Sequence, residues 1–176
     1  MPKDVVTATI SDQRILTEDS DQARELYAKS TFGTIQKGKV LLSSLEALYL
    51  VEKEKLIVTN TRGKEIPFEK LFDRLKRKKE DFAVQFRVFS DLRSRGYIVK
   101  TALKFGAEFR VYDKGIKPGK GHARWIVFPV PESRRFSWFE FSAKNRVAHS
   151  TRKKLLIGVV DAEDDVTYYE IKWIRP

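Results

Sequence analysis

Residues 154–174 read KLLIGVVDAEDDVTYYEIKWI, two runs rich in β-branched and aromatic residues with a short, mostly acidic segment between them. Such side chains are typical of strands, and a connection of this length between two strands is typical of a hairpin. The pattern therefore predicts a hairpin with strands over residues 154–160 and 166–174. Residues 161–165 (DAEDD) would form its tip.

The chain before this hairpin shows three more strand patterns and two helical ones. Runs of β-branched and aromatic residues predict strands over 97–99, 108–112 and 123–130. Apolar residues at helical spacing predict helices over 82–96 and 136–149. The second half of the chain is therefore expected to contain a small sheet with helices.

The first half shows a similar mixture. Strands are predicted over 5–10 and 56–59, and helices over 20–27, 43–51 and 68–79. The helix at 43–51 opens with the serine and glutamate of a capping box, which marks a helix N-terminus.

The order of these elements predicts an α/β (α+β) fold of two small mixed domains, each a small β-sheet with helices. Residues 1–81 are expected to form an N-terminal α/β domain, and residues 82–176 a C-terminal domain. A length of 176 residues suits either one medium domain or two small ones.

The composition excludes several kinds of site. The chain has no cysteine and two histidines, so disulfides, thiolate zinc sites, iron–sulfur clusters and cysteine nucleophiles are ruled out. Its apolar runs are much shorter than the roughly 20 residues of a membrane span, and no secretory signal pattern is present. The sequence is therefore expected to be cytoplasmic, without membrane contact.

The charge is concentrated in the second half. Residues 1–81 hold 16 Lys and Arg against 14 Asp and Glu, whereas residues 82–176 hold 19 against 10. A net charge of +9 in the second half favours a polyanionic partner such as nucleic acid. A solvated charged surface is the alternative interpretation.

The basic half also contains the groups that cleavage at phosphate needs, namely a base, an acid and a cation. His122 ends the glycine-rich loop DKGIKPGKG (113–121), and Tyr112 closes the strand before that loop. Lys153 and Lys154 begin a strand after a helix. Taken singly, the tyrosine could be a packing residue and the lysines surface residues. The other histidine, His149, is expected to be structural.

Taken together, these segments resemble the archaeal tRNA-intron (splicing) endonucleases. Tyr112 is followed by KGIKPGKGH, which ends at His122, and then by NRVAHSTRKKLL, which contains Lys153. The resemblance also includes DLRSRGYIVKT (91–101), FGAEFRVY (105–112), the acidic segment and residues 168–176. It is thinner in the first half, where LLSSLEALYL (41–50) and IPFEKL (66–71) carry it.

The resemblance implies an RNA endonuclease, a tRNA-intron lyase, that excises introns from precursor tRNA at bulge–helix–bulge junctions. It places Tyr112 as general base towards the 2′-hydroxyl, His122 as general acid for the leaving 5′-oxygen, and Lys153 as the cation that stabilises the pentacovalent phosphate. The products would be a 2′,3′-cyclic phosphate and a 5′-hydroxyl, formed without metal or cofactor. If the alignment with the family is shifted by one residue, Lys154 takes the role of the catalytic cation instead of Lys153.

The family resemblance gives two further residues a role in RNA binding. Arg146 occupies the place of an arginine that stacks on a bulged base in relatives. Trp173 lies where some relatives carry a second stacking side chain. The alternative for Trp173 is a core position beside Tyr169 and Ile171 on one face of a strand.

The acidic segment is expected to serve assembly. In the family the corresponding loop inserts into a basic cleft of a neighbouring subunit, which gives Asp161, Glu163, Asp164 and Asp165 that role here. The chain has the length of one subunit, not of two fused ones, and carries Tyr112, His122 and Lys153 itself. This favours a homotetramer. A catalytic subunit in a heterotetramer with a separate structural subunit is the second choice, and a solvated hairpin tip is the alternative role of the segment.

Two other functions compete with this one. The first is a metal-dependent nuclease built from Asp91, Glu108 and Asp113, although no clear Asp…Glu-x-Lys pattern is present. The second is a non-catalytic RNA-binding or structural subunit of a splicing complex, in which the triad should be incomplete.

Overall fold

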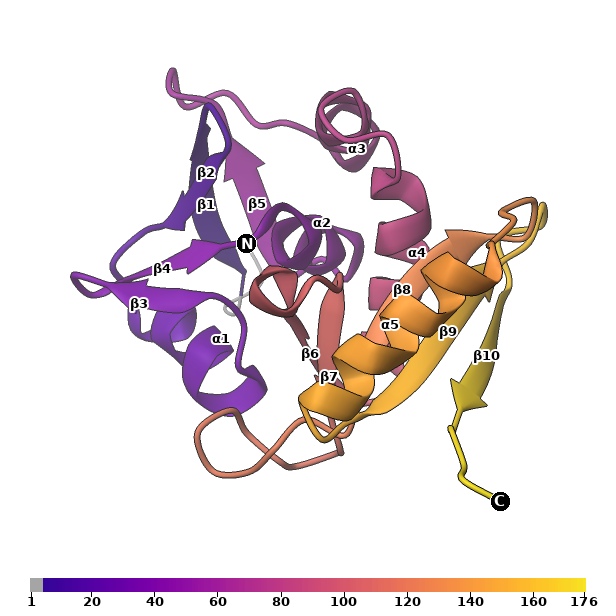
Figure 1. Ribbon diagram of the computed structural model, residues 1–176. Coiled ribbons are helices and arrows are strands. Elements are labelled where there is room, and N and C mark those ends of the chain that lie inside the picture. The colour runs from indigo at the N-terminus through magenta and orange to yellow at the C-terminus, as the bar shows by residue number, and fades with distance from the viewer. Residues whose placement is uncertain (1–4) are drawn as a thin grey trace. The chain divides into compact units, whose positions relative to one another are not determined.

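The computed structural model describes residues 5–176; residues 1–4, the start of the predicted first domain, lie outside the described residues. The chain divides into two compact units, Met1–Phe82 and Ala83–Pro176. Each unit has a five-stranded sheet accompanied by helices (Figure 1). The predicted fold class of two small mixed domains, each a sheet with helices, is therefore confirmed.

The sheet of unit 1 has the strand order β3-β4-β2-β1-β5. Its strands are β1 (Val6–Ser11), β2 (Arg14–Thr17), β3 (Thr34–Gln36), β4 (Lys39–Leu42) and β5 (Leu56–Thr59). β1 pairs parallel to β5, and the other neighbours are antiparallel. The strands predicted at 5–10 and 56–59 are thus present, whereas β2, β3 and β4 were not predicted.

The helices of unit 1 are α1 (Asp21–Ser30), α2 (Ser44–Glu52) and α3 (Phe68–Lys76). The predicted capping box is confirmed: the Ser43 side chain accepts from the Glu46 amide, and the Glu46 side chain accepts from the Ser43 amide. α3 ends before the predicted Lys79. Its backbone bonds change there from i−4 to i−3, as in the bond from Lys78 N to Leu75 O, and this tighter turn closes the helix.

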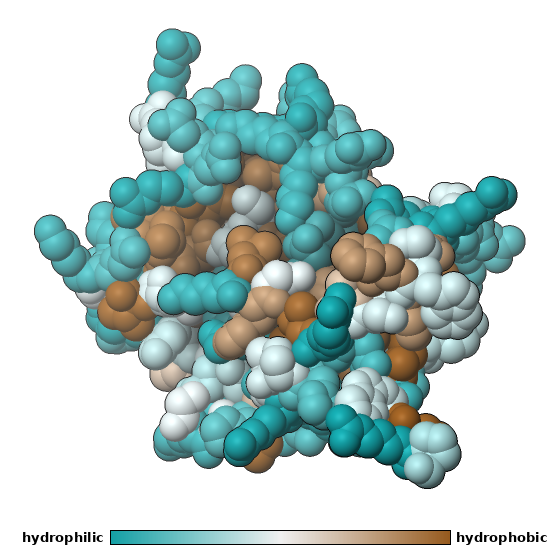
Figure 2. Space-filling model, viewed as in Figure 1, coloured by the Kyte–Doolittle hydropathy of each residue, from teal (hydrophilic) through white to brown (hydrophobic). Residues whose placement is uncertain are grey.

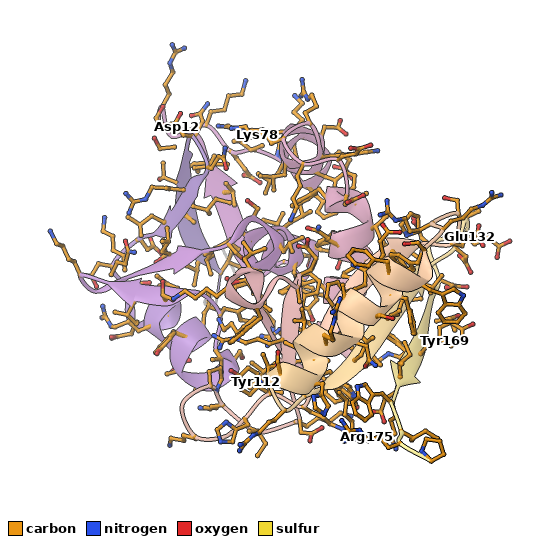
Figure 3. All side chains as sticks on the ribbon, in the orientation of Figure 1. Asp12, Lys78, Tyr112, Glu132, Tyr169 and Arg175 are labelled. Atoms are coloured by element: carbon orange, nitrogen blue, oxygen red, sulfur yellow. The ribbon has the colours of Figure 1, made fainter. Side chains whose placement is uncertain are left out.

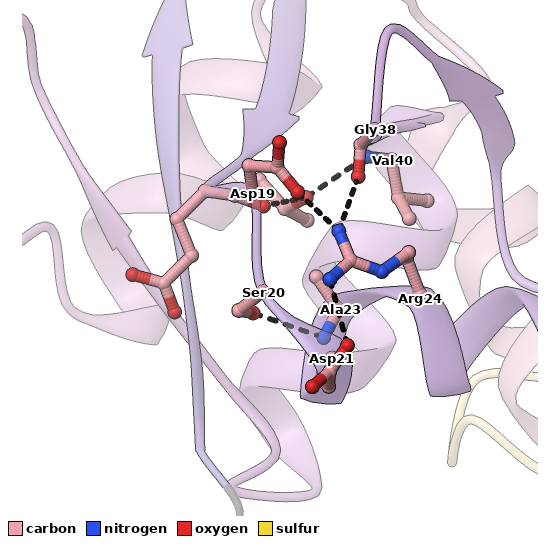
Figure 4. A network of polar contacts seen from close by, with 9 residues as sticks. Asp19, Ser20, Asp21, Ala23, Arg24, Gly38 and Val40 are labelled. Atoms are coloured by element: carbon pink, nitrogen blue, oxygen red, sulfur yellow. Dashed lines mark hydrogen bonds and ion pairs between the residues drawn. The ribbon is translucent and has the colours of Figure 1, made fainter.

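A polar network joins α1 to the turn between β3 and β4 (Figure 4). The Arg24 guanidinium donates to Asp19, to Asp21 at 2.7 Å and to the Gly38 carbonyl at 3.4 Å. Ser20 caps the helix by accepting from the Ala23 amide. These hydrogen bonds and ion pairs help to hold α1 against the sheet.

The sheet of unit 2 has the order β10-β9-β8-β7-β6. Its elements are α4 (Phe82–Ser94), β6 (Ile98–Thr101), the 3-10 helix η1 (Leu103–Phe105), β7 (Phe109–Tyr112), β8 (Trp125–Pro131), α5 (Trp138–Ser150), β9 (Lys154–Val160) and β10 (Val166–Ile171). β8 and β9 run parallel, and the other neighbours are antiparallel. The predicted hairpin is confirmed as β9 and β10, although β10 ends at Ile171 instead of residue 174.

One face of this sheet packs against α5. Ile126, Phe128, Leu155 and Ile157 form a buried cluster with Ala148 of α5. The strand residues in this cluster are two apart in sequence, because alternate side chains of a strand point to the same face. The intervening side chains must therefore point to the opposite face.

That opposite face packs against α4. The rings of Phe89 on α4 and Phe109 on β7 have centroids 5.9 Å apart. A Cβ placed on Gly158 of β9 would lie 3.1 Å from the methyl carbons of Val88. Glycine in the middle of β9 therefore allows α4 to approach the sheet closely.

The surface matches the charged composition. On the face shown in Figure 2, hydrophilic side chains dominate and hydrophobic ones lie between them. Among residues 5–176, no helix is both long and apolar enough to cross a membrane.

Candidate active site

Three strand ends of unit 2 meet at one end of the sheet. Val111 of β7 pairs with Trp125 of β8, and Trp125 pairs with Lys154 of β9. Tyr112 follows Val111, and Lys153 precedes Lys154, so both lie one residue beyond this row. Two strand spacings separate them, which puts their backbones about 10 Å apart. Figure 3 shows Tyr112 near the C-terminal end of α5, the helix that leads into β9.

The loop between β7 and β8 folds back on itself before His122. Gly115 and Gly119 have φ values of 78° and 86°, a conformation that favours glycine. A Cβ on Gly121 would lie only 2.5 Å from Cγ2 of Ile116, so this close crossing of the loop also depends on glycine. His122 follows this crossing and is exposed.

Tyr112 is buried on the α5 face of the sheet. Its exposed fraction is 4 %, and it packs in a cluster with Ile98 and Ala123, the residue after His122. The imidazole is therefore carried by the chain segment that contacts the tyrosine. Arg110, two residues earlier in β7, lies with its guanidinium 5.9 Å from the centre of the Tyr112 ring.

Lys153 and Lys154 lie on opposite faces of the sheet, because adjacent residues of a strand alternate. Lys154 Nζ donates to Glu170 at 3.0 Å, and Trp125 Nε1 donates to the other carboxylate oxygen at 2.8 Å. Both bonds lower the pKa of the Glu170 carboxyl below its usual range, and the bond from Trp125 has the larger effect. Lys154 is thus committed to an ion pair on the α4 face.

Lys153 instead continues the α5 face, which also carries Tyr112. It is half-buried, and its Nζ donates a bond of 2.8 Å to the Thr151 carbonyl. Tyr112, His122 and Lys153 therefore bring a hydroxyl, an imidazole and an ammonium to one end of the sheet. These groups suit general acid–base chemistry at a phosphate with a fixed positive charge beside it.

The two predicted base-stacking residues lie on and beside α5. Arg146 is exposed on the helix, and His149 lies one turn further along, close to the same face. Trp173 stacks on the His149 ring with centroids 4.9 Å apart and planes 3° apart. The alternative placement of Trp173 in the core of a strand is wrong, because β10 ends at Ile171 and Trp173 is 42 % exposed.

The acidic hairpin tip is held by its own backbone contacts. Asp161 Oδ1 accepts from the amides of Glu163 and Asp165, each at 2.9 Å. Arg87 of α4 donates to the Asp164 carbonyl at 2.8 and 3.1 Å. Asp161 thus shapes the tip, while the carboxylates of the other three acids are exposed and form no ion pair within residues 5–176.

The tip lies at the far end of β9 from Lys153. It follows Val160, whereas Lys153 precedes the first residue of this seven-residue strand. At about 3.3 Å per residue, the eight steps from Lys153 to Asp161 separate the tip from the candidate site by about 26 Å.

The three acids of the competing metal site do not come together. Asp91 accepts from the Tyr168 hydroxyl and from Arg95, both at 2.8 Å, and Asp113 pairs with Arg124 at 3.2 Å. Within the described part of the chain, no three His, Asp or Glu side chains are grouped so that they could hold a metal ion.

Tyr168 differs from Tyr112 in its surroundings. Burial raises the pKa of Tyr168 far above its usual range, and the bond to Asp91 raises it further. Tyr168 therefore keeps its proton and acts as a donor to Asp91, which suits a structural role.

Two side chains close to the candidate site were not predicted from the sequence, namely Arg110 and Phe105. Arg110 could have been found, because a residue two before Tyr112 on a strand must share its face. Phe105 gave no such signal, since its ring, 5.7 Å from Lys153 Nζ, comes from a turn remote in sequence.

Comparisons with known proteins agree with this architecture. Residues 82–168 match the family model of the tRNA intron endonuclease, catalytic C-terminal domain, and residues 6–72 match that of the N-terminal domain. The chain is 42 % identical over 173 residues to the tRNA-splicing endonuclease of Thermococcus onnurineus, an alignment that covers 98 % of this chain and 99 % of that protein.

Two further relatives show the same extent of similarity. The tRNA-splicing endonuclease of Pyrococcus abyssi is 39 % identical over 173 residues, covering 98 % of this chain and 99 % of that protein. The one from Methanothermobacter thermautotrophicus is 38 % identical over 171 residues, covering 97 % and 99 %. The predicted resemblance and the predicted enzyme class are confirmed by these comparisons. The chain therefore belongs to the tRNA intron endonuclease family, with an N-terminal and a catalytic C-terminal domain of that family.

Proposed function

We propose that this chain cuts precursor tRNA at bulge–helix–bulge junctions and so releases introns, with residues 82–176 as the catalytic domain. The observation that supports this most is the meeting of Tyr112, His122 and Lys153 at one end of the sheet in the unit that matches the family's catalytic domain. Residues 1–81 would form the N-terminal domain.

The cleavage is an in-line attack by the neighbouring hydroxyl of the RNA. Tyr112 takes the proton of the 2′-hydroxyl, and the 2′-oxygen forms a new bond to the adjacent phosphorus. The bond from phosphorus to the 5′-oxygen then breaks as His122 gives that oxygen a proton. The products are a 2′,3′-cyclic phosphate and a 5′-hydroxyl.

Lys153 balances the charge that develops during this attack. The pentacovalent phosphate carries more negative charge than the starting diester, and a fixed ammonium stabilises that state more than the ground state. Lys153 is preferred to Lys154 because it shares the α5 face with Tyr112, whereas Lys154 is paired with Glu170 on the other face. The mechanism uses no metal or cofactor.

RNA recognition would use the exposed side of α5. Arg146 and Trp173 offer planar groups on which unpaired bases can stack, a common way for proteins to bind splayed RNA. The net charge of +9 in residues 82–176 supports contacts with the phosphate backbone.

The chemistry of the cut is tested by the ends that it leaves. A substrate with a 2′-deoxyribose at each cleavage position is expected to bind but remain uncut, because the nucleophile is missing. The all-ribose substrate should give only cyclic phosphate and 5′-hydroxyl ends by mass spectrometry. Cleavage of the 2′-deoxy substrate, or 5′-phosphate ends, would contradict the proposed attack.

We also propose that the chain assembles as a homotetramer through the acidic tip, with a heterotetramer containing a structural subunit as second choice. The exposed carboxylates of Glu163, Asp164 and Asp165 lie about 26 Å along the sheet from the site of their own chain. They are therefore available to a basic cleft on another subunit, where opposite charges fix register and orientation. Asp161 contributes by holding the tip in shape.

Neutralising the three outward carboxylates is expected to lower the oligomer mass without unfolding the chain. The variant Glu163→Gln, Asp164→Asn, Asp165→Asn keeps Asp161 and so preserves the backbone bonds of the tip. Analytical ultracentrifugation should show smaller species than for the natural chain, and high salt should shift the natural chain in the same direction.

A matched control removes three exposed acids near α3 instead, with Glu69→Gln, Asp73→Asn and Glu80→Gln. This control should retain the mass of the natural assembly. An unchanged tetramer with full activity for the tip variant would mean that the tip is only a solvated hairpin end.

A further inference from the structure

A surface aromatic ring lies against the ammonium group that the proposed mechanism uses. Lys153 Nζ is 5.7 Å from the centre of the Phe105 ring and donates a 2.8 Å hydrogen bond to the Thr151 carbonyl. We infer that Phe105 is a positioning residue, which together with the Thr151 carbonyl holds the Lys153 ammonium at the reacting phosphate. This inference rests on the proposed function of Lys153.

The turn that carries Phe105 is anchored to the sheet. η1 opens with a bond of 2.8 Å from the Phe105 amide to the Ala102 carbonyl, and Gly106 ends it with a φ of 73°. Ala102 and Ala107 on either side are buried in the cluster that joins the sheet to α5. In Figure 1 this short turn connects β6 to β7. Phe105 is therefore presented from a fixed backbone.

Packing alone does not account for the ring. Phe105 is 37 % exposed, whereas its neighbours Ala102 and Ala107 are at most 3 % exposed. The face of an aromatic ring carries partial negative charge and attracts an ammonium group. A phenylalanine at this position thus offers a cation a partner that leucine or methionine would not.

The two contacts also leave the lysine free for substrate. An ammonium group has three N–H donors and no acceptor. One N–H donates to the Thr151 carbonyl, and the Phe105 ring covers one side of the ammonium group. These two contacts restrict the directions in which the remaining N–H donors can point. A cation ordered before the substrate arrives costs less reorganisation in the transition state, which favours kcat over binding.

The test replaces the ring and measures single-turnover cleavage of a bulge–helix–bulge RNA. Phe105→Leu and Phe105→Met are expected to lower the rate by about tenfold, the effect of a displaced but still present cation. Phe105→Tyr retains the ring and should stay within about twofold of the natural rate. Affinity for the uncleavable 2′-deoxy RNA should not change in any of these variants.

Two controls separate positioning from structural support. Leu103→Ala alters an exposed apolar residue of the same turn and is expected to leave the rate unchanged. In a chain that already carries Lys153→Ala, Phe105→Leu should have no further effect, because its partner is gone.

The outcomes distinguish this inference from the proposed function. If Lys153→Ala cleaves normally, the proposed role of Lys153 and this inference both fail. If Lys153→Ala is inactive while Phe105→Leu cleaves at the natural rate, the proposed function stands and the inference is overturned. The inference is also overturned if Phe105→Leu slows the Lys153→Ala chain as strongly as it slows the natural one.

Discussion

Replacing Lys153 with alanine is expected to lower the single-turnover rate of precursor tRNA cleavage by about 100- to 1,000-fold, the usual cost of losing one fixed group that stabilises transition-state charge. Binding of uncleavable 2′-deoxy RNA should change little, because the charge that Lys153 offsets develops only during the attack. Rapid-mixing cleavage assays with enzyme in excess measure the rate, and filter binding measures affinity.

Lys154→Ala is the matched control for this experiment. It removes the same charge from the neighbouring residue but breaks an ion pair with Glu170 on the α4 face. We expect near-natural cleavage with a small loss of thermal stability. The opposite result, a normal rate for Lys153→Ala and a severe loss for Lys154→Ala, would show that the catalytic lysine is one residue further along the chain.

His122→Ala is expected to lower the cleavage rate by about 100- to 10,000-fold, because the leaving 5′-oxygen then has no proton donor. A 5′-thio linkage at the scissile bond supplies a leaving group that needs no protonation. This substrate should therefore restore much of the rate of the variant. The measurement is the ratio of the rates of the thio and natural substrates for each protein.

The second histidine of the chain provides the comparison. His149 stacks on Trp173, so His149→Ala should weaken RNA binding, and the thio linkage should not rescue it. If the thio linkage fails to rescue His122→Ala, His122 only shapes the loop or orients the phosphate.

The elements with strong local signals could be predicted from the sequence. The capping box at Ser43, the strand before residues 161–165 and the start of the strand after them appear where the pattern placed them. All three depend on interactions within a few residues, which a sequence pattern contains directly.

The strands β2, β3 and β4 could not be predicted because their signal is short. Each has at most four residues, and β2 and β4 each begin with a charged residue, Arg14 and Lys39. β2 pairs with β1, and β3 with β4, across two-residue turns, whereas β2 pairs with β4 over a longer stretch of chain. This last pairing is a tertiary contact, which local propensity does not contain.

The candidate site shows the same division. The resemblance pointed to Tyr112, His122 and Lys153, but their position at one end of the sheet follows from the register of β7, β8 and β9. That register is a long-range property that single-chain patterns do not contain. It also separates Lys153 from Lys154, which are equivalent lysines in the sequence alone.

The alternative placement of Trp173 on a strand failed for a related reason. The run after residue 166 continues with β-branched and aromatic residues to Ile174, so propensity extends the strand past its true end. In the structure the ring stacks on His149 of α5, and the chain leaves the sheet after Ile171. A tertiary contact therefore overrides the local preference.

The central claim is that this chain alone cuts bulge–helix–bulge RNA by acid–base chemistry of its own side chains. The direct measurement incubates the purified protein with such an RNA in excess chelator and follows both junctions by gel electrophoresis. We predict cleavage at both junctions at the same rate as without chelator, because Tyr112, His122 and Lys153 supply the base, the acid and the charge. Loss of cleavage in chelator, restored by added Mg²⁺, would contradict the account.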